Sequence, residues 1–568
     1  MSENQAFYFF QSMQKGLNTI GYQIDAVDQE AYFIRITLSF TSITENPVLF
    51  IPAWRPGRYM LQNFAANIRD CKSCDSSGNI LSIEKQNRSE WKVLAKAGSE
   101  IMFSYHYYCR QMDAGGCWSD PSLFYINPIA CFMGVTGQTT DSCKIVFNLP
   151  ETFKIATGMN KQNLNTYSCP DFIALTDYPV MASCDLQTFT YSVGDIPFYI
   201  HSTADVSAFP ETFVSDFQAF SQAQINDFEH FPEKEYHFLL LLLPYTHYHG
   251  VEHRNSTVIC LGPVTDIKEK LYTELLGICS HELLHSWNIC KIRPEEMWPY
   301  DLSKENYFKT GFVAEGFTTY LGDYYLAKSG VLSIDWYTSE LNILLKRHFY
   351  SFGNDHLSIA DSSFDLWVDG YDAGIPARKV SIYVKGAVIA FLMDIAIRKS
   401  SNNNENILSL LKSLWSNYLT TDSGYSESDI KVLFHAYTNN TYTDAYQHWI
   451  YGTGDLKEDI IQALIYAGYT YTEEAHTNYL AGNFGILCDA HYVVQSVDPS
   501  SPYINSISKG DKILSVNDRA ISDYTTEELV SLTSFTAELS NGVRQWKQEI
   551  VISEETYFKT LKVEGKGL

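Results

Sequence analysis

The stretch "CSHELLHSWN", residues 279 to 288, places two histidines four positions apart with a glutamate directly after the first. Residues four apart share one face of a helix, so His281 and His285 are expected to reach a single metal ion. Glu282 then lies beside that face, where it can accept a proton from water. The alternative is a core helix whose histidines are satisfied by hydrogen bonds, and a third ligand is needed to decide between the two.

A candidate for the third ligand follows in the next helical segment. A catalytic zinc site needs three protein ligands and one open position. The continuation of a metzincin would require glycine at 288 and histidine at 291, and Asn288 and Lys291 exclude that class. The segment "FVAEGFTTYLGDYY" (312–325) instead supplies Glu315 among aromatic and aliphatic residues. Such an acid is unfavourable to bury unless it is paired or metal-bound, which favours a ligand over an exposed first-turn glutamate.

Length and composition describe a folded chain of several domains. Its 568 residues suggest roughly three or four domains, since one core does not grow to that size. A net charge of −25 argues against nucleic acid as a partner, because phosphate contacts need a basic face. The longest aliphatic run, "FLLLLLP" (238–244), is far shorter than the ~18 apolar residues of a membrane span, so no span is expected.

The start of the chain and its cysteines bear on location. The first sixteen residues, "MSENQAFYFFQSMQKG", lack a basic leader followed by a long apolar region. The twelve cysteines follow no disulfide framework, as is typical of a reducing compartment. We therefore expect a cytoplasmic protein.

Changes in sequence periodicity divide the chain into three parts. Residues 1–195 are rich in short β-branched and aromatic segments and predict a β-sandwich-like domain. Residues 196–472 combine a central strand near 236–244 with helices that include 268–288 and 310–328, which predicts an α+β catalytic domain with a helical C-terminal part. Residues 473–568 are strand-rich again, and "TTEELVSLT" (525–533) supplies a helix opened by a threonine cap.

Four motifs in a fixed order resemble one peptidase family. They are "PAWRPGRY" (52–59), "GVEHRNS" (250–256), "HELLHSWNICKIRP" with the later "EGFTTY" (315–320), and "SIYVKGAVIAFLMDIAIR" (381–398). Together they are similar to the glycyl aminopeptidase family of gluzincin metallopeptidases, distant relatives of the aminopeptidase N-like enzymes. The resemblance implies a thermolysin-like catalytic domain, one zinc ion held by His281, His285 and Glu315, and Glu282 as general base.

The resemblance also assigns two substrate contacts that chemistry supports. Attack on an amide builds negative charge on oxygen, and the Tyr383 hydroxyl matches the family's donor to that charge. Glu252 matches the residue that receives the substrate's α-ammonium group, although a surface acid paired with His253 or Arg254 is an alternative. Gly250 would let the substrate backbone approach closely.

Two positions near these motifs leave questions open. His249 stands where the family more often has a second glycine, which leaves the pocket for the first side chain undefined. Arg293 in "KIRP" either orients the substrate or, the reading we favour, anchors the loop after the zinc helix.

The tail resembles a PDZ domain, with "SKGDKILSVND" (508–518) in its strand–turn segment and "AGNFGI" (481–486) in the place of its carboxylate-binding loop. Exposed amides in that loop would bind a peptide C-terminus by strand addition.

The leading hypothesis is a zinc aminopeptidase that acts on peptides and, as the family resemblance implies, prefers glycine or alanine as the first residue. A zinc endopeptidase is one alternative. A PDZ-based scaffold protein with a structural zinc site is another, although Glu282 speaks against it because a structural site needs no adjacent base.

Overall fold

The computed structural model describes residues 19–205, 207, 209–268, 270–372, 374–419, 421, 423–565 and 567. Residues 1–16, where the sequence predicts no secretion signal, lie outside this part. No helix within it is long and apolar enough to cross a membrane. The chain forms two units: one contains the residues up to Asn306 with Leu321–Val331 and Leu414–Tyr425, and the other contains Tyr307–Tyr320, Leu332–Ser413 and the residues from Ser426 onward.

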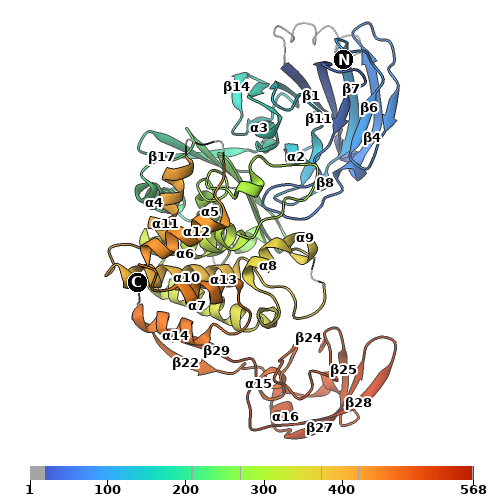
Figure 1. Cartoon of the computed structure of the whole chain (residues 1–568). Helices are drawn as coiled ribbons and strands as arrows, with labels where there is room; N and C mark the ends of the chain where they lie inside the picture. Colours follow the sequence, from blue (N-terminus) through green and yellow to red (C-terminus); the bar gives the residue numbers. More distant parts are fainter. Residues whose placement is uncertain are drawn as a thin grey trace. The chain divides into compact units, whose positions relative to one another are not determined.

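The first unit begins with a β-rich domain, as predicted (Figure 1). A seven-stranded sheet has the order β14-β15-β12-β1-β2-β7-β4, and two smaller sheets have the orders β13-β16-β10-β9-β8 and β11-β3-β6-β5. One cluster of buried aliphatic and aromatic side chains forms the core between them. The strands are β1 (Thr19–Asp28), β2 (Phe33–Thr41), β3 (Val48–Phe50), β4 (Ile68–Asp75), β5 (Ile83–Lys85), β6 (Glu90–Val93), β7 (Glu100–Tyr108), β8 (Arg110–Gln111), β9 (Cys117–Ser119), β10 (Phe124–Ile126), β11 (Gly134–Val135), β12 (Ser142–Asn148), β13 (Lys154–Ala156), β14 (Asn160–Asn163), β15 (Thr166–Cys169) and β16 (Val180–Ser183), with the short helices α2 (Pro128–Cys131) and α3 (Phe172–Thr176).

A five-stranded sheet with the order β17-β18-β19-β21-β20 follows in the same unit. Its strands are β17 (Gln187–Val193), β18 (Ile196–Ser202), β19 (Tyr236–Leu242), β20 (His247–His253) and β21 (Ser256–Gly262), and helices α4 (Phe213–Phe228) and α5 (Lys270–Leu284) accompany it. β19 lies in the middle, parallel to β18 and β21, as the aliphatic run predicts. β17 belongs to this sheet, although the sequence division placed residues up to 195 in the first domain. β20 is the edge strand of this sheet.

The helices that carry the metal-site candidates differ in detail from the sequence prediction. α5 ends at Leu284 instead of near residue 288, because the N–H groups of Ser286 and Trp287 bond to carbonyls three residues back and Ile289 turns the backbone at φ 93°. The predicted second helix is continuous from Phe312 to Lys328, but its first part is the π-helix η6 (Phe312–Phe317) and only the rest is the α-helix α6 (Thr318–Lys328). π-helical turns are often found at functional sites.

The second unit is mainly helical before it ends in strands (Figure 1). Within it, η6 and α10 cross closely: a Cβ atom on Gly316 would lie 2.3 Å from the carbonyl carbon of Gly386. Helix α11 runs from this unit into Leu414–Tyr425 of the first. The helices are α7 (Ile334–Phe349), α8 (Ile359–Phe364), α9 (Leu366–Asp369), α10 (Val384–Ser400), α11 (Ile407–Tyr418), α12 (Glu427–Tyr437), α13 (Thr443–Tyr451) and α14 (Lys457–Tyr466). The multidomain α+β class is confirmed.

The C-terminal part has its own buried cluster and three small sheets, with the orders β22-β29, β23-β24 and β26-β25-β27-β28. Thr525 caps the predicted helix α16 and forms a capping box with Glu528. The strand β22 spans the boundary expected at 472. The elements are β22 (Thr470–Glu474), α15 (Tyr479–Phe484), β23 (Ile486–Cys488), β24 (Val494–Val497), β25 (Lys512–Val516), β26 (Arg519–Ala520), α16 (Thr526–Val530), β27 (Ser534–Ser540), β28 (Gln545–Val551) and β29 (Thr560–Glu564).

The segment 481–486, expected as an open loop, is largely the end of helix α15. Its amides are used within the chain: Ala481 donates to the side chain of Asn478, Gly482 to the carbonyl of Asn478, and Gly485 to the carbonyl of Ala481. The helix forms because Asn478 caps it and Gly485 ends it in the left-handed conformation.

Candidate metal and substrate site

Helix α5 presents its two histidines opposite an apolar face. The side chains of that face are fully buried, and these are Leu275, Leu276, Cys279, Leu283 and Leu284. His285 directly follows the last residue of α5 and continues the turn, because its N–H donates to the carbonyl of His281. The two Nε2 atoms lie 3.0 Å apart. The four-residue spacing therefore brings both imidazoles to one point.

A backbone contact fixes which nitrogen of His285 is available. Its Nδ1 lies 2.9 Å from the carbonyl oxygen of Asn288. A carbonyl only accepts, so Nδ1 carries the proton and Nε2 keeps its lone pair. A backbone partner of this kind is typical of histidines that ligate metals.

The helical run that carries Glu315 is attached to α5 further along. Ser280 Oγ donates to the carbonyl of Gly322 at 2.8 Å, and a Cβ atom on Gly322 would lie 3.2 Å from the Cα of His281. Glu315 precedes Gly322 by seven residues, about two helical turns, and only 2% of it is exposed. One ligand atom each of His281, His285 and Glu315 lie within 4.8 Å of one another.

Two imidazole nitrogens and one carboxylate oxygen are a donor set that suits zinc. A second group within the described residues, Asp113, His247 and His249, is equally compact. There, however, Arg55 Nη2 lies 3.4 Å from Nε2 of His249, and Arg58 lies 4.0 Å from the Asp113 carboxylate. These guanidinium groups make the second group an unfavourable place for a cation.

The electrostatics of that second group follow from burial and from these charges. Burial lowers the pKa of His249. The hydrogen bond to Asp113 acts in the opposite direction, and the charge of Arg55 lowers the pKa further. Burial alone would raise the pKa of Asp113, but the hydrogen bond from His249 and the charge of Arg55 hold it well below its usual range. His249 therefore lies between a cationic side chain, Arg55, and an anionic one, Asp113.

Glu282 lies beside the edge strand β20. It is 5% exposed, and a Cβ atom on Gly250 would come within 2.4 Å of its Oε1 atom. The space that the missing side chain of Gly250 leaves is thus filled by the carboxylate of Glu282. This is a different reason for glycine from the close substrate approach that the sequence suggested.

Glu252 lies two residues further along β20 and is 7% exposed. His253 and Arg254, which the sequence offered as partners of Glu252, each contact another carboxylate. His253 Nδ1 lies 3.0 Å from Asp177, and Arg254 pairs with Glu233 at 3.3 Å. At this burial Glu252 is not a surface acid.

Tyr383 is half-buried and directly precedes helix α10. It stands one turn before Gly386, which packs against Gly316. Because Glu315 adjoins Gly316, this crossing brings the Tyr383 end of α10 to the segment that carries Glu315.

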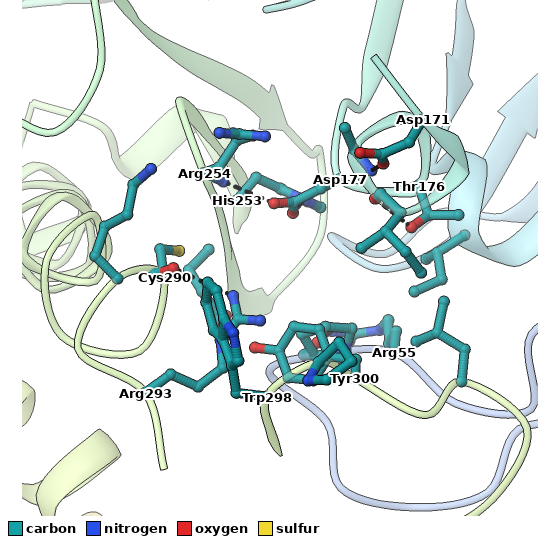
Figure 2. A pocket seen from close by; sticks show the side chains of 18 of the residues that line it. Arg55, Asp171, Thr176, Asp177, His253, Arg254, Cys290, Arg293, Trp298 and Tyr300 are labelled. Atoms are coloured by element: carbon teal, nitrogen blue, oxygen red, sulfur yellow. Dashed lines mark hydrogen bonds and ion pairs between the residues drawn. The ribbon is translucent and has the colours of Figure 1, made fainter. Parts of the chain in front are cut away.

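A cavity of about 340 Å³ lies next to Glu252, between the β-rich domain and the loop after α5 (Figure 2). Arg293 is one of its walls. The Arg293 side chain donates to the carbonyls of Ile289 and Cys290 at 3.1 and 3.2 Å and stacks on Tyr300 at 3.9 Å. These are the contacts of a loop anchor.

Sequence reasoning missed several residues of this region, namely Arg55, Gly57, Asp113, Asp177 and Tyr300. Only "PAWRPGRY" gave a signal, through its irregular run of proline and glycine.

Comparisons with known proteins agree with the architecture. Residues 21–184 match the Peptidase M61 N-terminal domain, and residues 274–389 match the M61 glycyl aminopeptidase domain. No curated protein matches the chain in sequence.

The first solved structure named here shares the fold, and the second is a weaker match. An aminopeptidase N family protein from Idiomarina loihiensis is 23% identical, with a TM-score of 0.88, over 96% of this chain and 98% of that one. An M1 zinc metallopeptidase from Deinococcus radiodurans, in a mutant form bound to Tyr-Ser-Ala, is 14% identical, with a TM-score of 0.46, over 78% of this chain and 96% of that one. The predicted enzyme class is confirmed: with these two domain matches, the chain is a metallopeptidase of the aminopeptidase class.

Proposed function

We propose that the enzyme releases the first residue of peptides at a single zinc ion held by His281, His285 and Glu315. The observation that carries the proposal is the spacing of two positions on β20. Gly250 adjoins Glu282, and Glu252 follows on the same face of the strand, roughly 7 Å further on. One extended residue spans about 3.5 Å and a charge-assisted hydrogen bond adds about 2.8 Å, so this distance accommodates one residue bound through its ammonium group. A carboxylate there would hold the α-ammonium group of a peptide whose first bond lies at Glu282.

The residues have complementary roles in hydrolysis. When bound, zinc acts as a Lewis acid that lets water lose a proton near neutral pH. Glu282 accepts the proton from the attacking water and returns it to the leaving amine. Tyr383 donates its hydroxyl proton in a hydrogen bond to the carbonyl oxygen, on which negative charge develops. Glu252 accepts a charge-assisted hydrogen bond from the substrate's ammonium group.

Finer features of the proposal rest on the family resemblance and on sequence pattern. They are a preference for glycine or alanine as the first residue, the division at 1–195, 196–472 and 473–568, and a cytoplasmic location, which suits the twelve free cysteines.

We also propose a PDZ fold for the C-terminal part. The support is its order of elements, in which β23 and β24 precede the sheet β26-β25-β27-β28 and α16 follows β26. The internal use of the amides at 481–485 argues against a carboxylate site there. Binding of a free C-terminal peptide, measured by fluorescence polarisation, would overturn that last inference.

The test of the proposed function compares alanine p-nitroanilide with its N-acetyl derivative. We expect cleavage of the free amine alone. Cleavage of both would indicate an endopeptidase, and cleavage of neither would favour the scaffold with a structural zinc.

Glu252→Ala sharpens this comparison. It should lower kcat/KM for free-amine substrates by about ten- to a hundredfold, the range for one charge-assisted hydrogen bond. If Glu252→Ala lowered kcat/KM for the N-acetyl substrate by the same factor, Glu252 would have no role in amine recognition.

A further inference from the structure

A loop of the β-rich domain lies directly against Glu252. We propose that this loop, Pro52–Tyr59, belongs to the amine-binding site and that Gly57 is the positioning residue that sets where the Glu252 carboxylate stands. The inference rests on the proposed role of Glu252 and extends it to a segment almost two hundred residues earlier in the chain.

The contact is made possible by the absence of a side chain. Gly57 has a φ of 73°, in the left-handed region that favours glycine. A Cβ atom at this position would lie 2.4 Å from Oε2 of Glu252 and 3.0 Å from Oε1 and Cδ. Each of these atoms belongs to the carboxylate, so any side chain at 57 would have to displace the group that receives the ammonium ion.

The first half of the loop is anchored to the segment after α5. The N–H of Ala53 donates to the carbonyl of Leu302 at 2.7 Å, and the indole N–H of Trp54 donates to the carbonyl of Asp301 at 2.8 Å. The Trp54 side chain is fully buried. The loop is therefore bonded to the segment that follows α5 and is also part of the β-rich domain.

Arg55 ties the same loop to β20. It is 3% exposed, and its guanidinium lies 3.4 Å from His249, which bonds to Asp113. A Cβ atom on Gly115 would come within 2.2 Å of Nε of Arg55, so the guanidinium is enclosed on that side too. Figure 2 shows Arg55 and Tyr300 among the side chains that line the neighbouring cavity.

These contacts explain why Gly57 can position Glu252. His249 and Glu252 belong to the same strand, and the loop is attached to that strand through Arg55 and abuts it through Gly57. Glu252 can hold a fixed place because the surface opposite it is itself fixed. The β-rich domain thus contributes to recognition of the substrate's first residue.

The test measures amine recognition with two zinc-binding inhibitors that differ only in the amine, glycine hydroxamate and acetohydroxamate. The inhibition constant of acetohydroxamate divided by that of glycine hydroxamate measures how much the ammonium contact contributes to binding. This ratio does not depend on cleavage of acylated substrates. Gly57→Ala should reduce that ratio by about ten- to a hundredfold, and the acetohydroxamate constant should stay unchanged. The matched control is Gly78→Ala, at φ 82° in the same domain with nothing within 4 Å, which should leave the ratio unchanged.

A double-mutant cycle separates positioning from general damage. In a Glu252→Ala background the added methyl group meets no carboxylate, so Gly57→Ala should then have no further effect on the ratio. Adding Glu252→Asp to Gly57→Ala sets the carboxylate back by one methylene, which makes room for the methyl group. The double variant should therefore regain part of the ratio. If Gly57→Ala alone folds poorly, the double variant should also regain stability.

The outcomes also distinguish this inference from the proposed function. If Glu252→Ala abolishes the preference for the amine and Gly57→Ala in a folded protein does not change it, the positioning role is wrong and the function stands. If Glu252→Ala leaves the preference intact, the amine-binding role of Glu252 is wrong. A loss that persists unchanged in the Glu252→Ala background would show that Gly57 acts through some other group.

Discussion

Gly250 leaves the space that Glu282 occupies, since a Cβ atom on Gly250 would lie 2.4 Å from Oε1 of Glu282 and 2.9 Å from its Cδ. Gly250→Ala should therefore displace the proposed general base without touching a zinc ligand. We expect kcat to fall toward that of Glu282→Gln, for which general-base loss gives roughly 10²–10⁴-fold. Steady-state kinetics with alanine p-nitroanilide measure the effect.

Zinc content serves as the control for this substitution. Both Gly250→Ala and Glu282→Gln should keep the metal of the wild-type protein, because neither residue is a proposed ligand. A Gly250→Ala enzyme with normal kcat and a raised KM would contradict the displacement of Glu282. It would favour instead the direct role of Gly250 in letting the substrate backbone approach.

His285→Ala should remove zinc from the protein. The Nδ1 atom of His285 is held by the carbonyl of Asn288, so Nε2 is the proposed ligand atom that the variant loses. We expect metal analysis after dialysis to give well under one zinc per chain, and activity to fall with it. His247→Ala is the matched control, because the group of Asp113, His247 and His249 faces two arginines. Full zinc in His285→Ala and loss in His247→Ala would reverse the assignment of the two groups.

Tyr383→Phe removes one hydroxyl and little packing volume. If that hydroxyl stabilises charge on the carbonyl oxygen, kcat should fall by about 10²–10³-fold, the size expected for one such donor. KM should change little, because the contact strengthens only in the transition state. An effect confined to KM would place Tyr383 in ground-state binding of the substrate.

The sequence predicted much of this arrangement because local rules govern it. The four-residue spacing of His281 and His285 requires only a helix, and the aliphatic run at 236–244 requires only a buried strand. Thr525 followed by Glu528 is a capping box in sequence and in structure. In each case the residues that determine the feature are neighbours along the chain.

The remaining features depend on contacts between distant segments. Gly57 and Glu252 meet only after the β-rich domain has packed on β20, and the bond between Asp113 and His249 joins the loop after β8 to the same strand. The end of α5 was misplaced because bonds to carbonyls three residues back compete with helical bonds beyond Leu284. At 481–486 the Asn478 cap favoured a helix over the loop expected from the resemblance.

The last prediction concerns acid stability and follows from His201 on β18. Burial, with a smaller contribution from neighbouring His237, lowers the pKa of His201 to about 3. Between its usual pKa near 6.5 and this value, the unfolded chain binds a proton that the folded protein does not, so stability falls as the pH falls through this window, by up to about 1.4 kcal/mol per pH unit.

His201→Asn removes the titrating group. Its melting temperature should therefore fall less between pH 6.5 and 4.5 than that of the wild type, even if it starts lower because the bonds to Thr188 and His237 change. His356→Asn, at an exposed histidine, should keep the full wild-type dependence. Equal pH dependence in the wild type and His201→Asn, by calorimetry, would show that His201 is protonated in the folded enzyme.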